Sequence, residues 1–256
     1  MDSRIATIAR ATLLEALRTR LAALMLVTLA VLLAVTFFVE ALAITEGTRI
    51  RAGIYASAMR LACVFIAGLY VLVSVAREFN DKGLDVLLAL DLPRSQYVLG
   101  RLAGFVAIAA SIAVVAALPL AWLAAPAAAA QWMISLGLEL AIVVALALFC
   151  IMAFNQLTPA ASFVLAFYLL ARSLTAIRLM GAHPLAGGDT LSHQVIQYTV
   201  EALALVMPAL DAWTQTAWLV NEPASWSTLA QLAGQSALYV TLLAAATIFD
   251  LYRKNF

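Results

Sequence analysis

Long apolar runs constrain this chain more than any other feature of its sequence. A helix needs about 20 mostly apolar residues to cross a bilayer, and the runs of that length cover residues 21–39, 52–76, 102–123, 132–154, 160–180 and 228–249. Composition agrees, because 65% of the residues are hydrophobic and only 11% are charged, whereas soluble domains carry roughly a quarter charged residues. The sequence therefore predicts an all-α integral membrane protein, with six transmembrane helices in a single domain over residues 1–256.

The lysine and arginine positions predict how the chain is oriented. With six spans, one side of the membrane carries Arg4, Arg10, Arg18, Arg20, Arg77, Lys82, Arg94, Arg101, Arg253 and Lys254. The other side carries only Arg49, Arg51 and Arg178, and Arg60 and Arg172 lie inside spans. Cytoplasmic loops are enriched in lysine and arginine, so we expect both termini in the cytoplasm. Counting residues 191–207 as a seventh span would place Arg253 and Lys254 outside, which the charge rule opposes.

Residues 3–20, ahead of the first span, are predicted to form an amphipathic helix. One face gathers Ile5, Ile8, Ala9, Leu13 and Ala16, with Thr12 among them, while Arg4, Arg10, Glu15 and Arg18 lie away from it. Leu14 is an exception, since it points toward the charged side. Such a helix can lie in the membrane interface with its apolar face toward the lipid. A solvated lead-in to the first span is the alternative.

The segment 181–227 is predicted to form a helical hairpin on the outer face, between the fifth and sixth spans. Gly181 and Pro184 end a helix, and residues 187–190 provide a turn with capping residues. The stretch 191–207 is apolar but carries His193, Gln194, Gln197 and Glu201, which favours a short amphipathic helix over a span. Asp211, Trp213 and Trp218 belong to a second short segment, and both tryptophans suit the lipid interface.

No catalytic or cofactor-binding motif is visible. His183 and His193 lack the spacing of a metalloprotease site, and the chain has neither a nucleophile elbow nor a phosphate-binding loop. Cys63 and Cys150 lie in apolar runs and are interpreted as small hydrophobic residues rather than a disulfide or metal pair. No basic face with interleaved aromatics points to nucleic acid. We therefore expect no catalytic, metal or cofactor site, although absent motifs alone leave an intramembrane enzyme as an alternative.

The most polar stretch, residues 77–101, lies between the second and third spans. It reads Glu78-x4-Gly83-Leu84-Asp85, continues through Leu87 and Leu88 to Asp91-Leu92-Pro93-Arg94-Ser95, and ends in Tyr97-Val98-Leu99-Gly100-Arg101. A short helix with Leu84, Leu87 and Leu88 would offer an apolar anchor with a charged rim, as helix-in-groove recognition requires. The second span can continue as a helix to about Asn80, and Pro93 marks the turn at which the chain leads back toward the third span. The stretch is thus predicted to dock a partner, with a merely solvated loop as the alternative.

This loop resembles that of the membrane subunit of type-2 ABC exporters. In that family a Glu-x4-Gly, a leucine-rich turn, a Leu-Pro-x-x-Arg-like element and a Gly-Lys precede the third span. The resemblance extends to the amphipathic helix, the outer hairpin, Pro208-Ala209-Leu210-Asp211 and the basic tail. It implies a coupling loop that docks on a cytoplasmic ABC ATPase subunit through Glu78, Gly83, Leu84, Leu87, Pro93 and Arg94.

The same resemblance implies the rest of the assembly. A second permease copy, identical or a close paralogue, would pair with this chain in a bacterial-type plasma membrane, and the ATPase would bind the ATP and magnesium. The chain departs from the pattern at Arg94, which directly follows Pro93, at Asp91 and at Arg101, where lysine is common. These departures affect the individual contacts that the loop would make with the ATPase, rather than the assignment to the family. The alternative is a membrane component of a haem or cofactor export and maturation assembly.

Three charges are predicted to lie inside spans: Arg60, Glu139 and Arg172. Each stands about eight residues from the outer end of its span, which corresponds to about 12 Å at the helical rise. Charges at this depth are costly and usually paired. We therefore expect Glu139 to pair with one or both arginines, either as a structural ion pair or in contact with a substrate.

Overall fold

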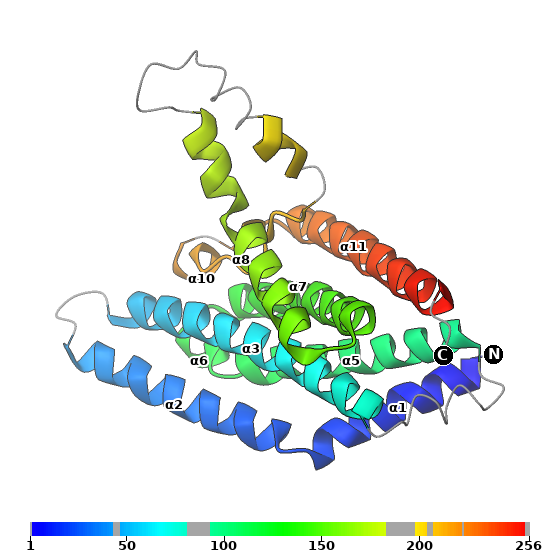
Figure 1. The fold of residues 1–256 in the computed structure, drawn as a ribbon. Helices are drawn as coiled ribbons and strands as arrows, with labels where there is room; N and C mark the ends of the chain where they lie inside the picture. The colour runs from blue at the N-terminus through cyan, green and yellow to red at the C-terminus, as the bar shows by residue number, and fades with distance from the viewer. Residues whose placement is uncertain are drawn as a thin grey trace.

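A computed structural model describes residues 2–42, 47–80, 93–182, 198–203, 207–221 and 223–253. All regular structure in these ranges is helical (Figure 1). The long helices are α2 (Leu21–Leu42), α3 (Gly47–Asn80), α5 (Arg94–Ala117), α7 (Pro126–Phe154), α8 (Leu157–Ala182) and α11 (Trp226–Arg253). These six helices are long and apolar enough to cross a membrane, and within the described residues they match the six predicted spans.

The long helices extend beyond the predicted spans. Helix α3 is 34 residues long and α5 begins at Arg94, eight residues before the expected start of the third span. Hydropathy marks where a helix meets lipid, whereas backbone hydrogen bonding continues until a proline or a cap ends it. Helix α5 ends before Pro119, and the four-residue helix α6 (Leu120–Leu123) completes the third span.

Helix α7 is the central helix of the bundle. Of its spanning window 78% is buried, against 11% for α2, which lies at the periphery. It contacts α3, α5, α8 and α11. Most of its apolar residues are buried, as expected for a helix surrounded by other helices. The first residue of α1 and the last of α11 lie at the same end of the bundle (Figure 1), and we call this the shared end.

Helix α1 (Asp2–Arg18) is present, but its apolar face does not simply meet lipid. Thr12 and Ala16 are buried, and Ile8 and Thr12 pack directly on Gly100 and Gly104 of α5. Glycine allows this approach because it has no Cβ. Part of the face predicted to lie on the membrane therefore packs against protein.

The segment 207–221 is buried in the protein instead of lying at the lipid interface. Trp213 is 1% exposed and Trp218 is 8% exposed, so the prediction that both belong to the interface is wrong. Trp213 donates its indole N–H to Ser236 Oγ of α11 at 2.9 Å, which satisfies its polar atom inside the protein. The short helices η1 (Leu210–Ala212) and α10 (Ala217–Val220) lie in this segment. Residues 183–197, which include both histidines, are outside the described residues.

Candidate functional site

Two polar clusters lie within the otherwise apolar bundle, one at the shared end and one toward the opposite end. The first, which we call the Arg101 clasp, consists of Thr12 and Glu15 of α1, Ser74 and Glu78 of α3, and Tyr97 and Arg101 of α5. The second, which we call the Glu139 cluster, consists of Arg60 of α3, Ser135 and Glu139 of α7, Tyr168 and Arg172 of α8, and Thr214.

Arg101 is the centre of the clasp, and its side chain is only 7% exposed. Its Nη2 and Nε atoms donate to Glu78 Oε2 at 2.5 and 3.2 Å, and its Nη1 donates to Glu15 Oε2 at 3.0 Å. The guanidinium therefore bonds carboxylates from two other helices. Such charge-assisted, multidentate bonds are the strong class of hydrogen bond.

Neighbouring hydroxyl groups complete the clasp. Tyr97 donates its hydroxyl to Glu78 Oε2 at 2.8 Å, and Ser74 donates to Glu15 Oε1 at 3.0 Å. Thr12 Oγ1 accepts a further bond from Arg101 Nη1 at 3.1 Å. Each carboxylate thus has two different partners, and α1, α3 and α5 are joined where α3 ends and α5 begins. Glu15 was expected to lie away from the packed face, but Arg101 draws it into the clasp.

The Glu139 cluster brings together the predicted intramembrane charges. Glu139 is fully buried, and its Oε1 lies 3.9 Å from Arg172 Nη1. Tyr168 donates to Oε1 at 3.0 Å, and Thr214 donates to Oε2 at 2.5 Å. Glu139 and Arg172 therefore pair as expected. Arg60 joins through the backbone of Thr214 rather than through the carboxylate.

Both arginines of the cluster hold the segment 207–216, whose only regular structure is the three-residue helix η1. Arg60 Nη1 donates to the carbonyl of Thr214 at 3.1 Å. Arg172 Nη1 donates to the carbonyl of Trp213 at 3.0 Å and also to that of Leu210. Non-helical backbone at membrane depth is tolerated only where protein or a cavity satisfies its polar groups. The two guanidinium groups meet this need.

Thr214 adopts a strained backbone conformation, with φ of 51°. A β-branched residue rarely occupies the left-handed region, and doing so costs on the order of 1–3 kcal/mol. The residue is fully buried and held at three polar atoms: its N–H donates to Ser135 Oγ at 2.8 Å, its hydroxyl bonds Glu139, and its carbonyl bonds Arg60. These bonds determine its position and offset the strain.

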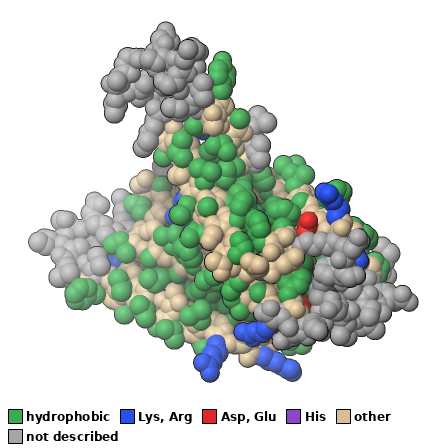
Figure 2. Space-filling model, in the orientation of Figure 1, with side chains coloured by type: hydrophobic (Ala, Val, Ile, Leu, Met, Phe, Trp, Pro, Cys, Tyr) green, Lys and Arg blue, Asp and Glu red, His purple; other side chains and the backbone are tan. Residues whose placement is uncertain are grey.

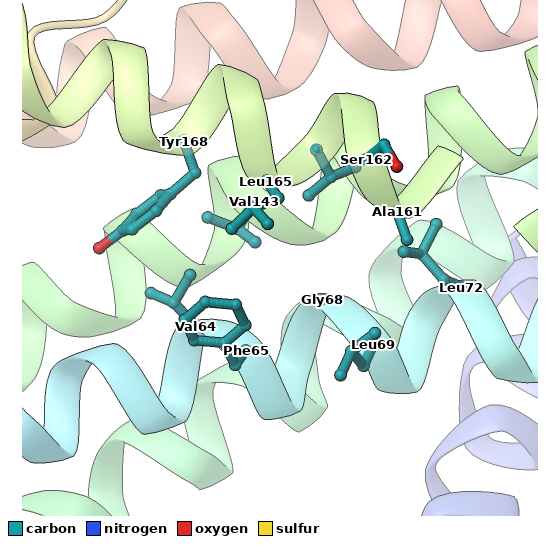
Figure 3. A pocket seen from close by; sticks show the side chains of 11 residues that line it. Val64, Phe65, Gly68, Leu69, Leu72, Val143, Ala161, Ser162, Leu165 and Tyr168 are labelled. Atoms are coloured by element: carbon teal, nitrogen blue, oxygen red, sulfur yellow. The ribbon is translucent and has the colours of Figure 1, made fainter. Parts of the chain in front are cut away.

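An apolar groove of about 240 Å³ runs between α3 and α8, over α7. Figure 3 shows Val64 and Phe65 of α3 on one side and Leu165 of α8 on the other, with Tyr168 at one end of the groove. Tyr168 lines the groove with its ring, while its hydroxyl bonds Glu139. This residue therefore connects the groove with the Glu139 cluster.

The predicted docking residues are only partly described. Glu78 belongs to the clasp, and Pro93 is the N-cap residue of α5. Arg94 Nη1 donates to the carbonyl of Leu251 at 2.6 Å, and the guanidinium lies 6.0 Å from the ring centre of Tyr252. Arg94 thus binds the end of α11 within this chain. Gly83, Leu84 and Leu87 lie outside the described residues.

Several residues of both clusters were not predicted, although spacing offered a signal for some of them. Gly100 and Gly104 form a small-x3-small pair, typical of close helix packing in membranes. Ser135 with Glu139, and Tyr168 with Arg172, are each four residues apart and so share a helix face. Thr214 and Glu15 carry no such signal, because their partners lie on helices distant in sequence.

The sequence matches no protein-family model and no curated protein. In the described part of the chain, no group of three His, Cys, Asp or Glu side chains is placed to hold a metal ion. Cys63 and Cys150 are both buried and not disulfide-bonded. The two polar clusters and the apolar groove are therefore the features on which a function can be argued.

Proposed function

We propose that this chain is the permease subunit of an ATP-driven exporter and works with a separate ATPase subunit. The observation that carries the proposal is the Arg101 clasp. It bonds the last turn of α3 to the first turns of α5, the helices that lead into and out of residues 81–92, and it adds α1 to both. A loop that receives force from a partner must be joined rigidly to its helices, and the clasp provides this.

Helix α3 connects the two clusters. It carries Glu78 of the clasp and Arg60 of the Glu139 cluster, 18 residues and therefore about 27 Å apart along one continuous helix. A tilt of α3 at the shared end would displace the arginine that holds the carbonyl of Thr214. The two clusters are thus mechanically linked through α3.

In this proposal the ATPase docks on residues 77–101 from the cytoplasm, where both termini also lie. Closure of two ATPase subunits around ATP and magnesium moves the clasp, and the pathway changes between inward-facing and outward-facing states as a rigid-body transition. Two copies, or this chain and a relative, pair in a bacterial-type plasma membrane. The apolar groove between α3 and α8 favours a substrate with a substantial apolar part.

Co-purification in mild detergent tests the partnership. We expect an ABC ATPase to be recovered with the full-length chain and with an Arg178→Gln control, whose exposed arginine lies on α8 and belongs to neither cluster. A cysteine replacing Asp85, in a chain without Cys63 and Cys150, should react only from the cytoplasmic side. Labelling from the external medium, or recovery of the intact chain without any ATPase, would refute the proposal.

The coupling between ATP binding and the membrane helices is tested separately at the Glu139 cluster. A cysteine at Gln215, next to Thr214, should change its labelling rate when ATP is added to the assembled complex. The Arg101→Gln variant should keep the ATPase but lose this ATP-dependent change, because α3 and α5 are no longer tied together. An unchanged response in Arg101→Gln would show that the clasp does not transmit the movement.

A further inference from the structure

A second apolar groove, of about 260 Å³, lies beside the junction of α1 and α2. We call this junction the elbow and define it as residues 18–21. Leu17 of α1, Leu21 and Met25 of α2, and Ile108 and Ile112 of α5 line the groove, and Ser111 supplies a hydroxyl group. Apolar cavities on the order of 150 Å³ accept a benzene molecule, so this groove has room for a stretch of hydrocarbon chain.

The groove follows from the way the helices diverge. Gly100 and Gly104 hold residues 5–12 of α1 tightly against α5. However, α1 ends at Arg18, and α2 begins at Leu21 with a change of direction (Figure 1). A wedge therefore opens between α2 and α5. Its α2 wall is formed by the first two turns of a helix that is long and apolar enough to cross a membrane.

Positive charge stands beside this wedge. Arg18 and Arg20 are exposed and flank the lining residues Leu17 and Leu21, and neither guanidinium has a hydrogen-bond or ion-pair partner among the described residues. Glu15 is the nearest acid along α1, but it bonds Arg101 and Ser74. Figure 2 shows basic side chains gathered along the lower edge of the molecule, where α1 meets α2 in Figure 1. The charge at the elbow is therefore not neutralised within the described chain.

We infer that the elbow is a binding site for an anionic membrane phospholipid, with one acyl chain in the wedge and the phosphate on Arg18 and Arg20. A neutral zwitterionic lipid can place a chain in the same wedge, but it lacks the net negative charge that the arginines attract. Each arginine near an anionic lipid surface contributes roughly fivefold in affinity. This inference rests on the elbow alone and does not depend on the transport role.

Native mass spectrometry of the intact purified chain tests the site. It would compare phosphatidylglycerol with phosphatidylcholine carrying the same acyl chains. We expect phosphatidylglycerol to bind more tightly, and the Arg18→Gln/Arg20→Gln double variant to reduce its affinity by up to roughly thirtyfold while phosphatidylcholine is little affected. The matched control is Arg178→Gln/Arg253→Gln, which removes the same charge away from the wedge and should keep the preference.

The wedge itself is tested by Ser111→Leu, which fills it without changing charge. This variant should weaken the binding of both lipids at least fivefold, because an acyl chain no longer fits into the wedge. Glycerol phosphate, which has no acyl chain, should not compete with phosphatidylglycerol for the wild-type protein. Equal affinity for the two lipids, an unchanged preference in Arg18→Gln/Arg20→Gln, or competition by glycerol phosphate would overturn the inference. So would a double variant that keeps the lipid preference but loses the ATPase, because the arginines would then serve a protein interface.

Discussion

Gly104 is the position at which the α1–α5 contact is most sensitive to a single added methyl group. A Cβ built on Gly104 would lie 2.6 Å from Thr12 Cβ and 3.0 Å from the carbonyl oxygen of Ala9. Ordinary contacts begin at 3.4 Å, so Gly104→Ala requires the two helices to separate by about 0.8 Å, the difference between 3.4 and 2.6. Neither neighbour can rotate away, because one is a Cβ and the other is backbone.

The expected cost follows from two opposing effects. Alanine favours a helix over glycine by about 0.8–1 kcal/mol, whereas overpacking of a tight interface costs typically 1–3 kcal/mol. The separation also lengthens the Arg101–Glu15 ion pair, now 3.0 Å. We therefore expect Gly104→Ala to lower the free energy of unfolding by up to about 2 kcal/mol relative to the wild-type chain.

Two glycines of the same chain provide matched controls. A Cβ on Gly234 meets nothing within 4 Å, and one on Gly137 lies 3.8 Å from Ala113 Cβ, so both alanine variants should be neutral or slightly more stable. Thermal unfolding of the detergent-solubilised chain measures the order, and hydrogen exchange measures protection of α1. If Gly104→Ala unfolds at the same temperature as Gly234→Ala, and the amides of α1 exchange no faster than in the wild-type chain, the close contact between α1 and Gly104 is not present in the protein.

Substitutions at three further sites test the two clusters and the turn between α7 and α8. Arg101→Met should destabilise the chain by about 2–4 kcal/mol in thermal unfolding, because Glu78 loses its cation in a largely buried position, and adding Glu78→Met should restore part of the loss. Glu139→Gln should destabilise by about 1–3 kcal/mol and speed hydrogen exchange around Thr214, a result that equal exchange would contradict. Asn155 has φ of 54°, so Asn155→Gly should be tolerated, whereas Asn155→Ala should cost about 1 kcal/mol, measured by the same melts.

The membrane-spanning helices could be predicted because lipid leaves the backbone few alternatives. A run such as 132–154 must form a helix in a bilayer, where unsatisfied peptide groups are costly. Similarly, Glu139 and Arg172 could be expected to meet because an unpaired charge at membrane depth is rarely tolerated. These predictions needed composition and spacing but no knowledge of which helices are neighbours.

The remaining features depend on contacts between distant segments. Thr214 looks like an ordinary surface residue in the sequence, yet Ser135, Glu139 and Arg60 hold it in the interior. Trp213 was assigned to the lipid interface on residue type alone, and it is buried because Ser236 supplies an acceptor within the bundle. Hydropathy cannot separate a residue that faces lipid from one that faces another helix.

The short connection between α7 and α8 has a consequence for how α8 can move. Only Asn155 and Gln156 separate the two helices, so the start of α8 is tied to the most buried helix of the bundle and provides a pivot for a rotation of α8. Displacement then grows with distance from the pivot. Arg172 lies 15 residues beyond Leu157, or about 22 Å along the axis, so a rotation of about 10° would carry its guanidinium about 4 Å. A small angular change at the connection between α7 and α8 is thereby enough to release the distant backbone carbonyls of Leu210 and Trp213.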